Sequence, residues 1–156
     1  MSALSFRLAA PSEYGRIEEL IIDAFEPITW YRKLDEQRGP LNGVDWRTRW
    51  HKRLEAVFAA QTILVGEFDG TVVAVATGTY DPLAALGFVD LLAVDLAHQG
   101  KGWGRDMLRA FLGHLRAQGA RYCNLECLAD NEAGNALYES EGWQVVTRMN
   151  RWFVDL

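Results

Sequence analysis

Three alternate glycines lie between a short apolar segment and a segment with helical periodicity, in the run Gln99-Gly100-Lys101-Gly102-Trp103-Gly104. Residues 88–94 before the run are mostly apolar, which is typical of a strand covered on both faces. Residues 107–115 after the run repeat apolar side chains at helical spacing. Glycines let a ligand approach the backbone, and a helix start offers N–H groups and a positive dipole. The run therefore predicts a diphosphate-binding site, with glycines that serve only as turn residues as the alternative.

The sequence of this run distinguishes it from two better-known phosphate-binding motifs. A P-loop requires Ser or Thr after Gly-Lys, whereas Gly102 follows Lys101. The dinucleotide fingerprint, started at Gly100, requires a further glycine at the position that Arg105 occupies. What remains is the pattern Gln-x-x-Gly-x-Gly over residues 99–104.

This pattern, preceded by Leu92-Ala93-Val94, resembles the acetyl-CoA motif of the GNAT superfamily of N-acetyltransferases. A second block agrees with it, because Asn131 is followed by Tyr138 and then by Gly142-Trp143, a spacing similar to the family's Asn, Tyr and Gly-aromatic segment. The two motifs stand in the family's order and are separated by a strand-like segment. The resemblance in element order covers nearly the whole chain, and it is sharp between Val89 and Trp143.

The resemblance implies acetyl-CoA as the cofactor, CoA as the product and no metal. The pantetheine arm would lie along the backbone of residues 92–94 like an extra strand, and the diphosphate would bind amides of residues 100–105. The side chains of Lys101 and Arg105 add charge to phosphate binding or remain in solvent. Asn131 bonds to the cofactor arm or only caps a helix, a role that the preceding aspartate can also fill. The implied cofactor-binding residues are Leu92, Ala93, Val94, Gln99, Gly100, Lys101, Gly102, Trp103, Gly104, Arg105 and Asn131.

Acetyl transfer from a thioester to an amine requires that the amine lose a proton, that the oxyanion be stabilised and that the leaving thiolate be protonated. The resemblance implies Tyr138 as the acid for the sulfur and a backbone amide near residues 92–94 as the oxyanion donor. Asp90 is the first candidate for the base, since it is a carboxylate in an apolar strand, two residues before Leu92 and expected on the same face. Glu126, on the neighbouring strand, is the rival. There are two alternatives to a catalytic base. The acidic residue has a purely structural role, paired with an arginine, or an ordered water takes the place of a side chain.

We expect an enzyme that transfers the acetyl group of acetyl-CoA to a primary amine of a small molecule or peptide, by direct attack in a ternary complex. A non-catalytic CoA-binding module that acts as a sensor or interaction domain is one alternative, and a transferase for a longer acyl group is another. In the family the acceptor is chosen by the segment between the first two helices, here residues 26–46, where Trp30 and Tyr31 are pocket walls or core residues. The acceptor stays open among a small amine, an amino acid, an aminoglycoside and a peptide.

The composition of the chain fits one domain over residues 1–156, since 49% of the residues are hydrophobic. A net charge of −5 argues against nucleic acid as a partner. Basic residues are concentrated between Arg32 and Arg53. They form either a solvated helix face or a surface that steers an anion such as CoA or an acidic acceptor.

Several classes of protein are disfavoured by what the sequence lacks. No apolar run approaches the about 20 residues that span a bilayer, and the N-terminus lacks a signal-peptide pattern, so we expect no membrane partner and a cytoplasmic location. Cys123 and Cys127 are expected as free thiols on one strand face in a reducing compartment. The three histidines lack ligand spacing, which argues against zinc.

The elements that must position these residues follow from periodicity and turn signals. An edge strand at residues 4–8 and helices at 14–25 and 46–58 precede a hairpin around Asp69-Gly70. The strand before the glycine run and the strand at residues 121–128 are joined by a helix, so they are expected to be parallel. The expected fold class is α/β in the mixed (α+β) sense. The resemblance specifies a GNAT-like, mostly antiparallel sheet flanked by helices, with a parallel strand pair that splays apart.

Other segments give weaker patterns. Residues 26–44 show no clear periodicity and break at Gly39-Pro40. Residues 130–141 predict a short helix. Residues 143–156 are β-rich and predict one long strand or a minimal hairpin, where the family usually has two strands. An exposed strand there would allow homodimerisation.

Overall fold

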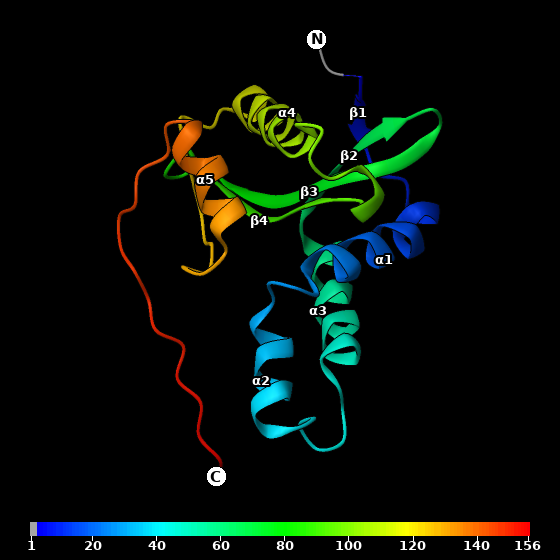
Figure 1. Cartoon of the computed structure of the whole chain (residues 1–156). Helices are drawn as coiled ribbons and strands as arrows, with labels where there is room; N and C mark the ends of the chain where they lie inside the picture. Colours follow the sequence, from blue (N-terminus) through cyan, green and yellow to red (C-terminus); the bar gives the residue numbers. More distant parts are fainter. Residues whose placement is uncertain (1–2) are drawn as a thin grey trace. The chain divides into compact units, whose positions relative to one another are not determined.

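Asp69 and Gly70 turn the chain between two β-rich runs, and both adopt positive φ, 49° and 76°, as a tight hairpin requires. Within residues 3–156, which the computed structural model describes, the hairpin belongs to a five-stranded sheet of order β1-β2-β3-β4-β5 (Figure 1). Neighbouring strands are antiparallel except β4 and β5, which are parallel. The mixed, mostly antiparallel fold is therefore confirmed. The strands are β1 (Ser5–Leu8), β2 (Thr62–Phe68), β3 (Thr71–Asp81), β4 (Leu86–Val94) and β5 (Tyr122–Leu125).

The chain divides after Glu126 into two units, and the second runs from Cys127 to Leu156. The first unit contains the sheet, the helices that cover it and two 3-10 turns. These helices are α1 (Tyr14–Phe25), α2 (Trp30–Arg38), α3 (Trp46–Ala60) and α4 (Trp103–Gln118), and the turns are η1 (Pro11–Glu13) and η2 (Leu96–His98).

Helices α1 and α3 cover one face of the sheet, and α4 covers the other (Figure 1). On the first face, Ile17 of α1 and Leu54 of α3 are fully buried in a cluster that includes strand residues. On the second face, glycines in the sheet leave room for α4. A Cβ atom at Gly78 would lie 3.0 Å from the ring of Phe111, and one at Gly87 would lie 2.7 Å from Leu115. Close packing on both sides keeps β3 and β4 in place.

The structure places helix α2 within residues 26–44, a segment in which the sequence shows no clear periodicity. The side chain of Thr29 caps the helix by accepting a hydrogen bond from the Tyr31 N–H, and Gly39 ends it at φ 81°. Leu34 is the one residue of this helix that is buried. The helix therefore lacks the apolar stripe by which an amphipathic helix is recognised in a sequence.

Thr29 also joins α2 to α3, because its buried Oγ1 accepts a hydrogen bond of 2.8 Å from the indole Nε1 of Trp50. Thr29→Val keeps the shape of the side chain but removes the helix cap and leaves a buried N–H unpaired. We expect the free energy of unfolding to fall by about 1–3 kcal/mol. Urea unfolding measures the change, with Thr29→Ser as the matched variant that retains the hydroxyl. Equal losses in both variants would contradict the hydrogen-bond explanation.

The second unit consists of α5 (Glu132–Ser140) with the segments on either side of it. Residues 143–156 form neither helix nor strand, so the expectation of a strand or a hairpin there is wrong. Residues such as Val145 and Val146 favour extended backbone, but a strand also needs a neighbour that supplies hydrogen bonds. No strand of the described chain is paired with this segment.

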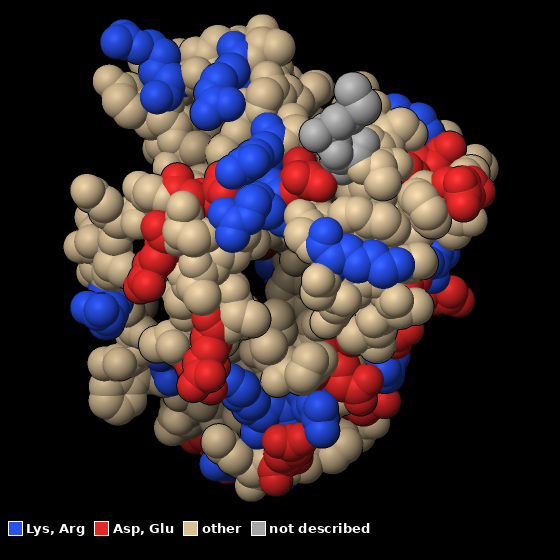
Figure 2. Space-filling view, turned by 45° about the horizontal axis from the view of Figure 1, so that its top comes forward, with Lys and Arg blue, Asp and Glu red and all other residues tan. Residues whose placement is uncertain are grey.

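Among the described residues, no helix is long and apolar enough to cross a membrane. In the same part of the chain, no three His, Cys, Asp or Glu side chains are grouped as metal ligands. Both cysteines are free, but β5 ends at Leu125, so Cys127 lies beyond the strand that it was expected to share with Cys123. Basic and acidic side chains are interspersed over the face shown in Figure 2.

Candidate active site

The glycine run forms the entry into α4. Gly100 and Gly102 adopt φ of 83° and 81°, a backbone conformation that favours glycine, and a Cβ atom at either position would meet no atom of the described residues within 4 Å. The first helical hydrogen bond runs from Asp106 N to Gly102 O, so the N–H groups of Trp103 and Gly104 have no acceptor within the helix. Open space, approachable backbone and N–H groups at a positive helix end together fit a diphosphate.

The side chains of the run hold this turn in place. Trp103 is buried, and its ring lies 5.0 Å from that of His98 and 5.1 Å from that of Phe68. The Lys101 ammonium lies 2.9 Å from His98 Nδ1 and 4.9 Å from the Trp103 ring centroid. Gln99 donates from Nε2 to the carbonyl oxygen of Val94 at 3.2 Å, which ties the turn to the end of β4. Trp103 therefore offers its N–H to a ligand while its side chain is part of the core.

Half of β4 has an open edge. Its pairing with β5 runs only from Leu86 to Val89, and no β5 residue faces the remainder of the strand up to Val94. The pairing stops because β5 ends at Leu125, and each of its four residues is paired with β4. The expected splay of the pair stays a prediction.

The register of β3 and β4 decides which backbone groups face this opening. Asp95 N donates to Val73 O at 2.8 Å, and residues of an antiparallel pair alternate between bonding to the partner and pointing away from it. By this alternation Ala93 directs its N–H and C=O toward β3, whereas Leu92 and Val94 direct theirs toward the opening. The N–H groups of Leu92 and Val94 are therefore placed for an extended ligand arm.

A β-bulge lies at Asp90. Leu91 pairs with Thr77 and Val89 pairs with the next residue, Gly78, so Asp90 is an additional residue in β4. The extra residue changes the alternation of side chains. The Asp90 carboxylate contacts residues of the α3 side, while Leu91 packs in the core of that same face. The expectation that Asp90 and Leu92 share a face is therefore wrong.

Both oxygens of the Asp90 carboxylate accept hydrogen bonds. Arg53 Nη2 donates to Oδ1 at 2.8 Å, and Gln61 Nε2 donates to Oδ2 at 2.9 Å. The Arg53 guanidinium also lies 4.7 Å from the ring centroid of Trp50. Asp90 thus has the arginine partner that the structural interpretation required, and 13% of its side chain is still exposed. A role as a base requires that one of these contacts be exchanged for an amine or a water.

Glu126, the rival base, is exposed and follows the end of β5. It was expected within a strand of residues 121–128, but the strand is shorter and ends at Leu125. Asp90 and Glu126 therefore do not lie on paired strand segments, because pairing of β4 with β5 stops at Val89.

In the second unit, Tyr138 and Asn131 belong to α5 and its cap. Asn131 Oδ1 accepts from Gly134 N at 3.1 Å, so the helix-cap role falls on Asn131. The Tyr138 ring lies 5.9 Å from that of Trp143. Burial, with a smaller contribution from Cys127, raises the pKa of Tyr138 to about 12. The phenol therefore holds its proton at neutral pH, as a general acid must.

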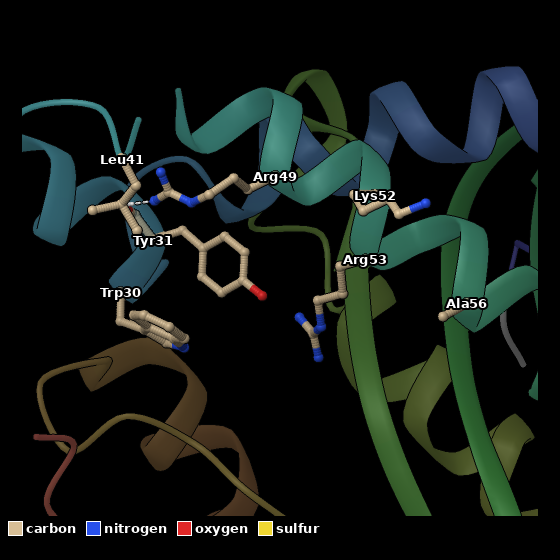
Figure 3. Close-up of a pocket in the computed structure, with 7 residues that line it drawn as sticks. All are labelled: Trp30, Tyr31, Leu41, Arg49, Lys52, Arg53 and Ala56. Carbon is tan, nitrogen blue, oxygen red and sulfur yellow. Dashed lines mark hydrogen bonds between the residues drawn. The ribbon is translucent and has the colours of Figure 1, made fainter. Parts of the chain in front are cut away.

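A pocket of about 470 Å³ opens beside α2 and α3 in the first unit (Figure 3). Trp30 and Tyr31 form part of its wall, which is where the sequence placed them as one of two alternatives. Arg49 holds the wall in place, because it pairs with Asp35 at 2.8 Å and donates to the carbonyl oxygen of Tyr31 at 3.1 Å. The lining residues are Trp30, Tyr31, Leu41, Arg49, Lys52, Arg53 and Ala56.

Sequence reasoning missed the individual partners around the site. Arg53 and Gln61 hold Asp90, and His98 contacts Lys101, although none of the three belongs to a motif. For Arg53, the available signal was its place at the end of the basic cluster that begins at Arg32.

Comparison with known proteins identifies a family and several relatives. A family model described as "Acetyltransferase (GNAT) family" matches residues 20–143. The chain is 42% identical over 72 residues to the mycothiol acetyltransferase of Kocuria rhizophila, covering 46% of this chain and 22% of that protein. It is 43% identical over 65 residues to the N-alpha-acetyltransferase RimI of Mycobacterium tuberculosis, covering 42% of this chain and 39% of that protein. Each match spans less than half of the relative.

Solved structures share the fold at low sequence identity. The ribosomal-protein-S18-alanine N-acetyltransferase from Escherichia coli has a TM-score of 0.69 and 18% identity, over 92% of this chain and 79% of that one. The PaiA N-acetyltransferase from Thermoplasma acidophilum, in complex with coenzyme A, has a TM-score of 0.65 and 15% identity, over 93% of this chain and 91% of that one.

Proposed function

The chain belongs to the GNAT family of acetyltransferases, and from this premise we propose that it transfers the acetyl group of acetyl-CoA to a primary amine by direct attack in a ternary complex. We propose that residues 1–156 act together as one acetyltransferase domain. A small molecule or a peptide supplies the amine.

One observation carries the proposal: the open edge of β4 lies next to the glycine entry of α4. Leu92 and Val94 direct their N–H groups toward this edge, and the first turn of α4 offers N–H groups at the end of the same strand. A pantetheine arm hydrogen-bonded to the edge would bring its diphosphate to the glycine run. Acetyl-CoA, when bound, supplies the thioester that reacts with the amine.

The residues of the chain then have separate tasks. We propose that Tyr138 gives its proton to the sulfur as the thiolate leaves. A backbone N–H near Leu92 stabilises the charge that develops on the carbonyl oxygen. Asp90 accepts the amine proton, directly or through a water, after exchange of one of its hydrogen bonds, and Glu126 remains the second candidate for this role.

Thermal unfolding with and without acetyl-CoA is the first test. A ligand that binds only the folded state stabilises it by about 2.7 kcal/mol at 100 times its Kd, so the unfolding midpoint must rise. Release of free thiol in the presence of an amine then tests transfer. An unchanged midpoint at high acetyl-CoA would contradict the cofactor site. A raised midpoint with no thiol release from any amine would favour a non-catalytic CoA-binding module. Faster turnover of longer acyl-CoA thioesters than of acetyl-CoA would favour a transferase for a longer acyl group.

A further inference from the structure

We infer that the acceptor is a small amine that also bears a carboxylate, with an apolar or aromatic body, and that Arg53 binds this carboxylate. The inference rests on the proposed function and specifies its substrate class. It depends on the pocket beside α2 and α3, whose volume of about 470 Å³ suits a small molecule.

One side of the pocket is apolar and fixed in shape. The rings of Trp30 and Tyr31 meet edge to face with centroids 4.4 Å apart, and Leu41 and Ala56 also line the space. Arg49 locks this side, since it donates to the carbonyl oxygens of both Tyr31 and Val44. A preformed aromatic wall selects an apolar body in the ligand.

The polar side of the pocket consists of cations. Arg49, Lys52 and Arg53 line it, and no Asp or Glu is among the lining residues that the structure describes. Arg49 is committed to Asp35, with which it forms a pair that is mostly shielded from solvent. Lys52 pairs with Glu55 at 3.0 Å, but both side chains are largely exposed, and such a pair is easily exchanged. A polycationic amine would find no carboxylate among the described lining residues to pair with, which disfavours it.

Arg53 is the residue that decides the class of ligand. Its Nη2 donates to Asp90, whereas its Nε and Nη1 donate to no acceptor within the described residues. Figure 3 shows the guanidinium reaching from α3 into the space beside Tyr31. A planar guanidinium with unused N–H donors binds a carboxylate better than any neutral group.

Arg53 also links the pocket to the reacting strand. It holds Asp90 at the bulge of β4, and Leu92 follows two residues later at the open edge. A carboxylate on Arg53 therefore anchors the ligand beside Asp90 and directs its amine toward that edge. In the transfer, the amine nitrogen forms a bond to the acetyl carbon as the C–S bond breaks. One proton leaves the nitrogen and one is gained by sulfur, while the carboxylate and Arg53 are unchanged.

Matched acceptors test the inference. Phenylalanine, phenylalaninamide and phenethylamine share one aromatic body, and leucine and isopentylamine form an aliphatic pair. We expect kcat/KM to be about 10- to 100-fold higher for each amino acid than for its counterpart without a carboxylate, the range of a charged hydrogen bond. Phenylalaninamide loses its amine proton more readily than phenylalanine, so amine basicity cannot produce a preference for phenylalanine within this pair. Phenethylamine and isopentylamine are more basic than their amino acids, so their rates are compared after correction for the fraction of unprotonated amine.

Arg53→Gln should lower the preference for the carboxylate to near unity. Arg47→Gln is the control, because Arg47 lies on the same helix, pairs with Asp23 and Glu26, and does not line the pocket. This variant should keep the wild-type preference. A ratio between two acceptors is insensitive to partial loss of folded enzyme.

Equal or better use of the amines without a carboxylate would overturn the inference, as would an unchanged ratio in Arg53→Gln. Reaction of acidic peptides but of no free amino acid would also overturn it. The inference would also be overturned if acetyl-CoA raises the unfolding midpoint but neither the amino acids nor their counterparts react. Failure of acetyl-CoA to raise the midpoint, together with absence of thiol release from every amine, would instead refute the proposed function.

Discussion

Tyr138→Phe is expected to lower the turnover number for acetyl transfer by about 10²- to 10⁴-fold, the contribution of a positioned general acid. Binding of acetyl-CoA and the unfolding midpoint should remain near the wild-type values. Within the described residues the phenol oxygen has no hydrogen-bond partner, and the ring contact with Trp143 at 5.9 Å is kept by phenylalanine. The substitution therefore removes the proton donor and little else.

The pH dependence gives this prediction a second readout. Because burial raises the pKa of Tyr138 to about 12, the phenol stays protonated through neutral and mildly alkaline pH. The wild-type turnover number should then show no decline from loss of this proton between about pH 7 and pH 10, whereas an ordinary tyrosine would already be half ionised at its usual pKa of about 10.

Thiol release at saturating acetyl-CoA measures both effects. Tyr122→Phe is the matched control, since Tyr122 lies on β5 with 61% of its surface exposed and should leave the turnover number unchanged. A Tyr138→Phe enzyme with wild-type turnover would remove the acid role from this residue.

The parts of the site that are local in sequence were predictable. Alternate glycines between an apolar strand and an amphipathic helix predicted a turn with approachable backbone, and Gly100 and Gly102 do adopt positive φ at the entry into α4. The point at which β5 ends, and with it the pairing to β4, could not be obtained from periodicity. Composition gives the existence of two neighbouring strands but not where their pairing stops.

The orientation of Asp90 was not predictable, because the assumption of strict alternation fails at a bulge. A bulge is a property of two paired strands, here the offset between Thr77 and Gly78 across from β4. Its partners Arg53 and Gln61 precede Asp90 by 37 and 29 positions. Contacts of that separation are decided by tertiary packing, which hydrophobic patterns do not encode at the level of single polar side chains.

For residues 143–156 the β-rich composition predicted a strand that the structure lacks. For helix α2 the sequence pattern predicted no helix, because the helix is defined by caps at Thr29 and Gly39 and has no apolar stripe. Both cases have one physical cause. Propensity describes one segment, whereas an element forms when its backbone hydrogen bonds and caps are satisfied.

Gly104→Glu is expected to weaken acetyl-CoA binding by about 10- to 100-fold, which corresponds to about 1.4–2.8 kcal/mol. Gly104 lies in the first turn of α4, where the proposed diphosphate would accept N–H bonds. Among the described residues, a Cβ atom there would meet only Val94 Cγ2, at 3.8 Å, so the new side chain has room. Glutamate is also favourable at a helix start, and any residue other than proline exceeds glycine in helix propensity. The unliganded variant should therefore unfold at or above the wild-type midpoint.

Gly104→Gln separates charge from size, because glutamine matches glutamate in shape and carries no charge. Titration with acetyl-CoA should show a clearly smaller loss for Gly104→Gln, and the difference between the two variants should shrink as salt is raised, since exposed charges are screened. Equal losses at all salt concentrations would mean that steric blocking, not repulsion of phosphate, causes the effect. Unaltered binding in both variants would place the diphosphate away from this turn. The glycines of the run would then serve only the backbone conformation that Gly100 and Gly102 adopt before α4.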